Sequence, residues 1–383
     1  MNIILFIIIS FLFFEFLHYS RKISPLNLEP SNWKVISEQG KTIVNGKIKI
    51  TNPHKRMEVM VPKFELKPLL IGNGRYQNVT IETNLKLSGQ GTNTNYTNYW
   101  QANIVKSKSA SVIDVGIILV DNSNELSGLC NIWMEVNWIN YGPFGQIIRK
   151  DGFNIPIKYP EKLTHNNANF KNSTYFSTLP IKTHVLGVLD DPYKLIKNYT
   201  TNIIMPGDII TIGETPLSIM QGRYHHPNNI NTTLLSRSLC YFFHPTSSLA
   251  TACGMQSLIN EVGPSRVIIA WIIGSAFKLI RVKGMFYRLA GEQARLVDDI
   301  TGTTPPYDQS IVMGPKDPYA FCKYLYQETG LNIAIVDVND LGKVKILASS
   351  KNADRSLIKK ALKSNPAGNA DEQTPLVLIR PLK

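Results

Sequence analysis

Ala334-Ile335-Val336-Asp337-Val338-Asn339-Asp340 is the most telling run in this 383-residue chain. Its apolar residues predict a buried strand, and that strand ends abruptly in carboxylates. A second run, Leu296-Val297-Asp298-Asp299, repeats the pattern. Such strand ends are where α/β folds place the groups that handle ligands. The two runs therefore predict a mixed α/β domain with a binding site at the ends of its strands.

The carboxylates of these two runs are candidate metal ligands of the predicted site. Carboxylate oxygens suit Mg²⁺ or Mn²⁺, and these ions commonly carry nucleotide phosphates. The pair therefore favours a phosphoryl-transfer site. A different interpretation also fits, in which Asp298 and Asp340 are turn or helix-cap residues, because aspartate is frequent in both places.

Outward from these runs, residues 179–383 alternate strand-like and helix-like stretches, which is typical of an α/β or α+β domain. The stretch 161–178 is rich in Asn, Ser, Thr and Lys, and we expect it to be the interdomain linker. Within the domain, the apolar run 267–280 is short for a membrane span and predicts a buried or interfacial helix.

Residues 42–160 carry a different pattern, in which apolar and polar residues alternate between turn-rich pieces. Val44, Gly46, Ile48 and Ile50 are one such series. Alternation at this spacing predicts an antiparallel β-sandwich. The early Asn52-Pro53 turn gives this domain a loose resemblance to the sandwich of late-embryogenesis-abundant proteins, which implies packing or interaction and no catalysis.

The first residues predict a membrane anchor over 1–22, because Ile3 to Leu17 is almost entirely Ile, Leu and Phe. Arg21 and Lys22 follow this run, and no small-residue cleavage site appears, so we expect an uncleaved anchor. Basic residues collect on the cytoplasmic side, which places the body of the chain in the cytoplasm. Residues 23–30 are expected to be a short linker.

The net charge of +13 predicts an anionic partner. Membrane lipid fits a tethered chain best. Nucleic acid is not expected, since no zinc-finger, helix-turn-helix or RNA-binding signature accompanies the charge. A basic stripe over 351–363 is either a lipid contact or a solvated helix face. The four cysteines are scattered and predict free thiols in a reducing compartment.

Three stretches of the second domain together resemble one family. They are Leu179–Thr183 followed by Pro206–Ile212 and Ser218–Arg223; the aspartate pair preceded by Lys316–Ala320; and Gly368–Arg380. Over about residues 178–383 the chain is similar to the GTP-dependent coenzyme F-420:L-glutamate ligases. The resemblance implies the fold of the gamma-glutamyl ligases.

In that family, GTP activates a carboxylate as an acyl phosphate and the amine of L-glutamate attacks it, with divalent metal bridging the phosphate oxygens. The resemblance implies that Asp298 and Asp337 bind the metal and that the chain forms a homodimer. It also implies a set of nucleotide- or substrate-binding residues, which are Gly207, Asp208, Gly222, Arg223, Gly368 and Asn369.

The chain departs from the family at two places. Ile219 stands where the ligases have a lysine, and the segment after Asp337 lacks two arginines, for which Lys343 or Lys345 could substitute in part. Two functions therefore stay open. One is a membrane-anchored, nucleotide- and metal-dependent ligase that joins glutamate to a carboxylate; the other is an inactive ligase fold serving as a binding or scaffold module. The loop histidines His225, His226 and His244 offer a further possible metal set.

Overall fold

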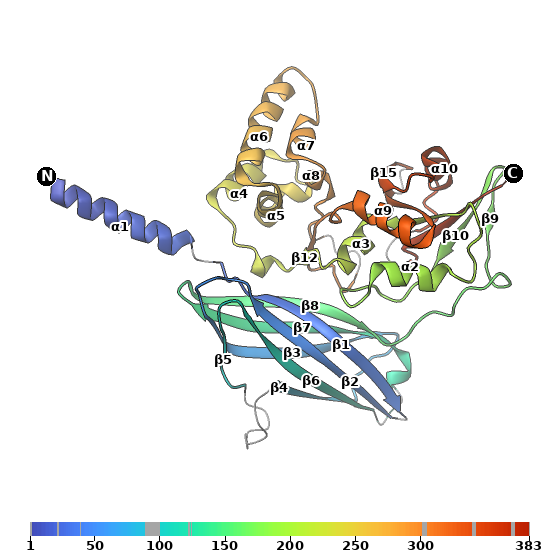
Figure 1. Cartoon of the computed structure of the whole chain (residues 1–383), viewed down its shortest axis with the longest axis horizontal. Coiled ribbons are helices and arrows are strands. Elements are labelled where there is room, and N and C mark those ends of the chain that lie inside the picture. The colour runs from blue at the N-terminus through green and yellow to red at the C-terminus, as the bar shows by residue number, and fades with distance from the viewer. Residues whose placement is uncertain are drawn as a thin grey trace. The chain divides into compact units, whose positions relative to one another are not determined.

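The computed structural model describes residues 2–20, 23–38, 40–88, 100–121, 123, 125–300, 305–338, 342–368 and 372–382. The chain divides into two compact units, Met1–Ile157 and Lys158–Lys383 (Figure 1).

The first unit opens with helix α1 (Asn2–Ser20), whose apolar side chains from residue 3 to 16 are mostly exposed. Within the described part of the chain, no single helix combines the length and apolar character that a membrane span requires. Helices α5 (Ala252–Val262) and α6 (Pro264–Leu279) meet the requirement only as a pair, which bends by 114°. Arg21 and Lys22, which carried the predicted orientation, lie outside the described residues.

The rest of the first unit is a sandwich of two antiparallel four-stranded sheets with strand orders β1-β2-β6-β4 and β5-β3-β7-β8. The alternation of the sequence explains the core, because every second residue of β2 and β7 points inward, as Val44, Ile48 and Trp138 do. The prediction of a sandwich is thus confirmed. The strands are β1 (Asn27–Glu38), β2 (Lys41–Asn52), β3 (Val59–Gly72), β4 (Val79–Leu87), β5 (Asn103–Val105), β6 (Ser109–Asp121), β7 (Leu129–Gly142) and β8 (Gly145–Pro156).

Strand β1 lies in a stretch that the sequence pattern had assigned in part to a linker, so the sandwich begins well before residue 42. The reason is local. The pairing of β1 with β2 shifts register between Ser31 and Lys34, and Asn32 has a φ of 55°. Such a bulge interrupts the period-two alternation by which strands are recognised.

The second unit is built on a six-stranded sheet of order β15-β14-β11-β16-β10-β9. Only β11 and β14 run parallel; the other neighbours are antiparallel. The predicted linker over 161–178 is wrong in its second half, which contributes β9 and the start of β10 to this sheet. The strands are β9 (Lys171–Asn172), β10 (Phe176–Ile181), β11 (Ile209–Gly213), β14 (Asn332–Val338), β15 (Val344–Ser349) and β16 (Leu376–Pro381).

Helices cover both faces of this sheet, which confirms the mixed α/β class. Ile210 and Ile212 of β11 point to the face packed by α2, α3 and α9, whereas Ile209 points to the face packed by α10. Continuous apolar strands are expected where both faces are buried. These helices are α2 (Pro192–Thr200), α3 (Glu214–Met220), α9 (Pro318–Thr329) and α10 (Arg355–Ala361).

A separate helical group, residues 234–296, is inserted between α3 and β13 and has its own apolar core (Figure 1). The short strands β12 (Tyr224–His225) and β13 (Ile311–Val312) pair with each other at its base. In addition to α5 and α6 it contains α4 (Leu234–Leu239), α7 (Met285–Ala290) and α8 (Gln293–Leu296).

Candidate functional site

The second unit contains a cavity of about 380 Å³. Its wall includes Gly213, which ends β11, and Val336, which lies near the end of β14. These two residues are register partners in the parallel pair. The cavity therefore lies at the carboxyl ends of two adjacent parallel strands, which is where open α/β sheets bind ligands.

Asp298 and Asp337 both line this cavity. Asp337 is placed there by β14. Asp298 is held from another direction by an isolated β-bridge, in which its N–H donates to the carbonyl of Val312 and its carbonyl accepts from the N–H of Val312, both at 2.8 Å. The structure thus brings together the two aspartates that the sequence singled out.

Glu214 is a third carboxylate in the same wall, and the sequence analysis missed it. It directly follows β11 and starts α3, so the signal that selected the aspartates, an acid at the end of an apolar strand, was also present here. Its Oε2 atom is buried without a hydrogen-bond partner. Burial, then the charges of Asp337 and Asp298, raise the pKa of Glu214 to about 8, although Lys345 opposes the shift.

Asp298 also has a raised pKa, because the protein removes part of its hydration and because Asp337 and Asp299 are negative neighbours. Its side chain nevertheless keeps contact with solvent. The negative charges of Glu214 and Asp298 are thus disfavoured where they stand, so a cation or a proton would be stabilised beside them.

Of the five predicted nucleotide or substrate residues that the structure describes, only Gly368 lines the cavity. Its φ of 65° is the left-handed region that favours glycine, and its carbonyl accepts from the Asn365 side chain at 3.2 Å. Asn369 lies outside the described residues.

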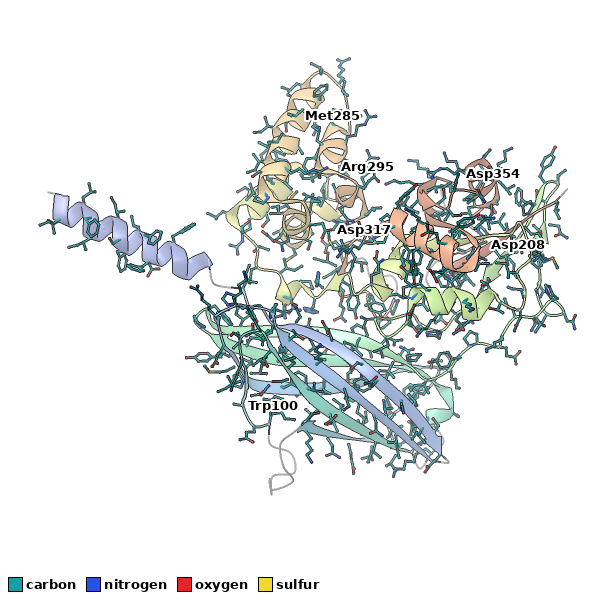
Figure 2. The ribbon with its side chains drawn as sticks, viewed as in Figure 1. Trp100, Asp208, Met285, Arg295, Asp317 and Asp354 are labelled. Carbon is teal, nitrogen blue, oxygen red and sulfur yellow. The ribbon has the colours of Figure 1, made fainter. Side chains whose placement is uncertain are left out.

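Gly207 and Asp208 precede β11 and so lie at the opposite end of that strand from the cavity. Asp208 is buried and forms a two-pronged ion pair with Arg380, whose Nε and a terminal nitrogen donate at 2.9 and 2.7 Å. It also accepts from the N–H of Met205 at 2.8 Å. Figure 2 labels Asp208 far from Arg295 of the helical group. Asp208 therefore holds the start of β11 to Arg380 of β16, and it does not line the cavity.

Gly222 and Arg223 form the turn after α3, and neither lines the cavity. The Arg223 Nε donates to the carbonyl of Gly314 at 2.6 Å, and its guanidinium pairs with Glu261 at 2.9 Å. Arg223 therefore links the turn after α3 to the segment after β13 and to α5 of the helical group.

No lysine or arginine occurs among the described residues that line the cavity. Ile219, which replaces the family's lysine, is one of the lining residues and is almost fully buried. Lys345 faces Asp337 across the β14–β15 pair, but its ammonium forms an ion pair with Glu292 at 2.6 Å. The described wall thus offers acids and neutral groups to a ligand.

His184 lines the cavity as well and was not identified from the sequence. Its ring contacts the Asp190 carboxylate at 2.9 Å and the Tyr199 hydroxyl at 2.8 Å. Tyr307 donates to the carbonyl of Leu186 at 2.9 Å. These bonds fix the segment after β10 that forms one side of the cavity.

Across the described residues, no group of three or more His, Cys, Asp or Glu side chains could hold a metal ion by itself. The loop histidines form local contacts instead. His226 accepts from the N–H of Asn228, and the ring of His244 contacts the hydroxyl of Thr246 at 2.8 Å.

The fold and the site together describe a two-unit protein, an Ig-like sandwich followed by an α/β unit with an acidic cavity. Residues 27–159 match the family model described as the N-terminal Ig-like domain of F420-0:gamma-glutamyl ligase. The match covers the first unit only, and it names the same ligase family that the motifs of the second unit resemble. It is more specific than the late-embryogenesis-abundant resemblance.

No curated protein matches the chain. Similar solved structures include the yeast GGA1 GAE domain (13% identity, 35% of this chain and 93% of that chain, TM-score 0.22). A FixG-related protein from Vibrio parahaemolyticus (11%, 36% and 99%, TM-score 0.20) and a protein from Archaeoglobus fulgidus (12%, 34% and 98%, TM-score 0.16) are others. TM-scores this low carry no weight for function.

Proposed function

We propose that the second unit is a ligase-like module whose cavity binds a nucleotide, GTP or ATP, together with Mg²⁺ or Mn²⁺. Its reaction would join an amino acid, glutamate, to a carboxylate acceptor through an acyl phosphate. The observation that supports this most is the convergence on one cavity of Asp298, Asp337 and Glu214, whose Oε2 atom is buried without a hydrogen-bond partner.

The donor set fits an ion that arrives with its nucleotide. Mg²⁺ usually keeps several waters and takes one or two carboxylates plus substrate phosphates, so it does not need an all-protein cage. Asp298 and Asp337 would hold it. The bound ion would neutralise charge on the transferred phosphoryl group.

The residues of this chain supply the rest of the site. The Gly368 turn contributes backbone to the cavity wall, and the Glu372 side chain lies where a Cβ at this position would be. The walls contributed by Ile219, Val336 and Val338 exclude water from an activated carboxyl group. Glu214 can hold or release a proton near neutral pH because its pKa is raised to about 8.

A second candidate, an inactive binding or scaffold module, is favoured by one specific observation. Ile219 cannot stabilise phosphate charge, and the described cavity wall contains no lysine or arginine that replaces the family's cation. In that case the acidic cavity would bind a cation or a small polar ligand without chemistry.

Nucleotide-dependent stabilisation of the full chain separates these candidates. With GTP or ATP at about a hundredfold excess over its Kd, and Mg²⁺ or Mn²⁺ present, we expect roughly 2.7 kcal/mol of stabilisation. The double variant Asp298→Asn/Asp337→Asn should lose the response. A matched control, Glu161→Gln/Glu328→Gln, removes the same charge from exposed residues that do not line the cavity and should retain it.

Glutamate-dependent release of phosphate, with a glutamylated product seen by mass spectrometry, would then establish the ligase reaction. Stabilisation without turnover supports the binding module. A flat response to both nucleotides with either metal excludes the nucleotide proposal.

We also propose that α1 attaches the chain to membrane lipid, with the body on the cytoplasmic side. The exposed apolar side chains of this helix, such as Phe6 and Phe16, support it. Replacing Phe6, Ile9 and Phe13 by serine should move the protein from the membrane to the supernatant fraction after cell lysis. Unchanged fractionation would contradict the attachment.

A further inference from the structure

Residues 278–283, Lys-Leu-Ile-Arg-Val-Lys, connect α6 to α7 at the outer end of the helical group (Figure 1). Met285, labelled in Figure 2, begins α7 just after this 278–283 turn. The three apolar side chains of the 278–283 turn are exposed to solvent, Leu279 over 87% of its surface, Ile280 over 67% and Val282 over 41%. Contiguous exposed apolar groups of this kind mark interaction surfaces.

The backbone holds this turn in a defined shape. The N–H of Val282 donates to the carbonyl of Phe277 at 2.9 Å, and the N–H of Arg281 donates to Lys278 at 3.1 Å, which is the Schellman pattern of a helix end. Arg281 has a φ of 65°, at the position where glycine is usual. A long basic side chain thus occupies a left-handed backbone position, where glycine would relieve the backbone strain.

The charge around the 278–283 turn has one sign. Residues 262–291 contain no Asp or Glu, and they contain Arg266, Lys278, Arg281, Lys283 and Arg288. Among the described residues, the flanking acids Glu261 and Glu292 are already paired, with Arg223 and Lys345 respectively. No carboxylate in the described part of the chain pairs with Lys278, Arg281 or Lys283.

We propose that the 278–283 turn docks on an anionic lipid bilayer surface, as a membrane contact separate from α1. Leu279, Ile280 and Val282 would enter the boundary between headgroups and acyl chains, while the basic side chains extend to the lipid phosphates. Charge complementarity favours this occupant. If a second copy of the chain bound the same surface across a two-fold axis, the basic side chains of the two copies would face and repel each other.

The test uses the full chain and a local readout, because the apolar α1 can bind vesicles by itself. Amide hydrogen exchange of residues 277–284 is measured with vesicles of phosphatidylcholine, and with vesicles of equal parts phosphatidylcholine and phosphatidylserine. We expect exchange in this segment to slow only with the anionic vesicles, and the effect to weaken in high salt.

The variant Lys278→Gln/Arg281→Gln/Lys283→Gln should lower the apparent affinity behind this protection roughly a hundredfold, about fivefold for each basic group. Its matched control is Lys351→Gln/Lys359→Gln/Lys360→Gln, which removes the same charge from the exposed basic stripe at α10 and should keep the protection. Leu279→Ser/Ile280→Ser should weaken binding while leaving its salt dependence in place.

Three results would overturn the proposal. One is equal protection by neutral and anionic vesicles, and another is no protection by either. The third is protection that rises with protein concentration in the absence of lipid, which would show that a second copy covers the turn.

Discussion

At the residue scale, Glu214 is the side chain whose ionisation most distinguishes the cavity. It is the acid with a buried, unpartnered oxygen, and its pKa is raised to about 8 by burial and by two neighbouring aspartates. Below pH 4.5 the carboxyl group is protonated in both the folded and unfolded states. As the pH rises toward 8 only the unfolded state releases this proton, so stability falls across that window.

We therefore expect Glu214→Gln to be more stable than the natural chain above pH 8, by roughly 4 kcal/mol. The pH dependence of its unfolding free energy between 4.5 and 8 should be flatter, with a remainder from Asp298, whose pKa is also raised. Urea denaturation at several pH values measures both. Glu328→Gln, an exposed acid, serves as control, and parallel curves for Glu214→Gln and the natural chain would contradict the burial of this carboxyl.

Asp208 was assigned to ligand binding by its motif, and the structure gives it another partner. Its buried carboxylate pairs with the partly buried Arg380, so Asp208→Asn leaves the guanidinium without its carboxylate partner. We expect a loss of about 3 kcal/mol in the free energy of unfolding. Any nucleotide-dependent stabilisation of the remaining native protein should be unchanged, as measured by denaturation with and without nucleotide. A selective loss of that response would restore Asp208 to the site.

At the scale of elements, close packing of α6 on α7 depends on Gly274. A Cβ at this position would lie 2.9 Å from the backbone nitrogen of Phe286 and 3.0 Å from its Cβ, closer than side chains tolerate. Gly274→Val should force the two helices apart and cost about 1 to 3 kcal/mol. Faster hydrogen exchange in both helices would report it. Ala276→Val, on the exposed side of the same helix, should have little effect, and equal effects would refute the contact.

Strands were predictable from the sequence where one hydrophobic pattern continued along them. They were missed where a local irregularity interrupted that pattern. The alternation in β2 and β7 and the apolar runs of β11 and β14 gave the two fold classes correctly. Strand β1 was missed because its bulge near Asn32 breaks the alternation. Strand β9 was missed because two residues are too few for any period.

The residues of the site were also predictable only in part. Asp337 lies near the end of β14, as the apolar run before it predicted. The run before Asp298 was predicted to be a strand, but Leu296 ends helix α8 and Asp298 forms only an isolated β-bridge with Val312. Arg223 and Asp208 match a motif, but motif identity does not show which side chains become internal ion pairs. That outcome depends on Glu261 and Arg380, which are distant in sequence, and on the inserted helical group.

At the scale of the whole molecule, each unit has its own apolar core. The sandwich buries residues such as Ile117 and Trp138, and the second unit buries the two faces of its sheet. Leu163 and Phe170 pack against the second core, so the chain joins that unit soon after residue 158. Independent cores of this size are expected to fold as separate domains.

We therefore expect trypsin to cut the native chain first near Lys158 and Lys162, where the neighbouring residues Tyr159 and Glu161 are exposed and outside regular structure. Mass spectrometry should find two resistant fragments, and each should keep the thermal midpoint that it shows within the full chain, because its core is intact. If unit 158–383 alone lost its cooperative transition, its stability would depend on the sandwich, and the acidic cavity would have to be studied as a property of both units together.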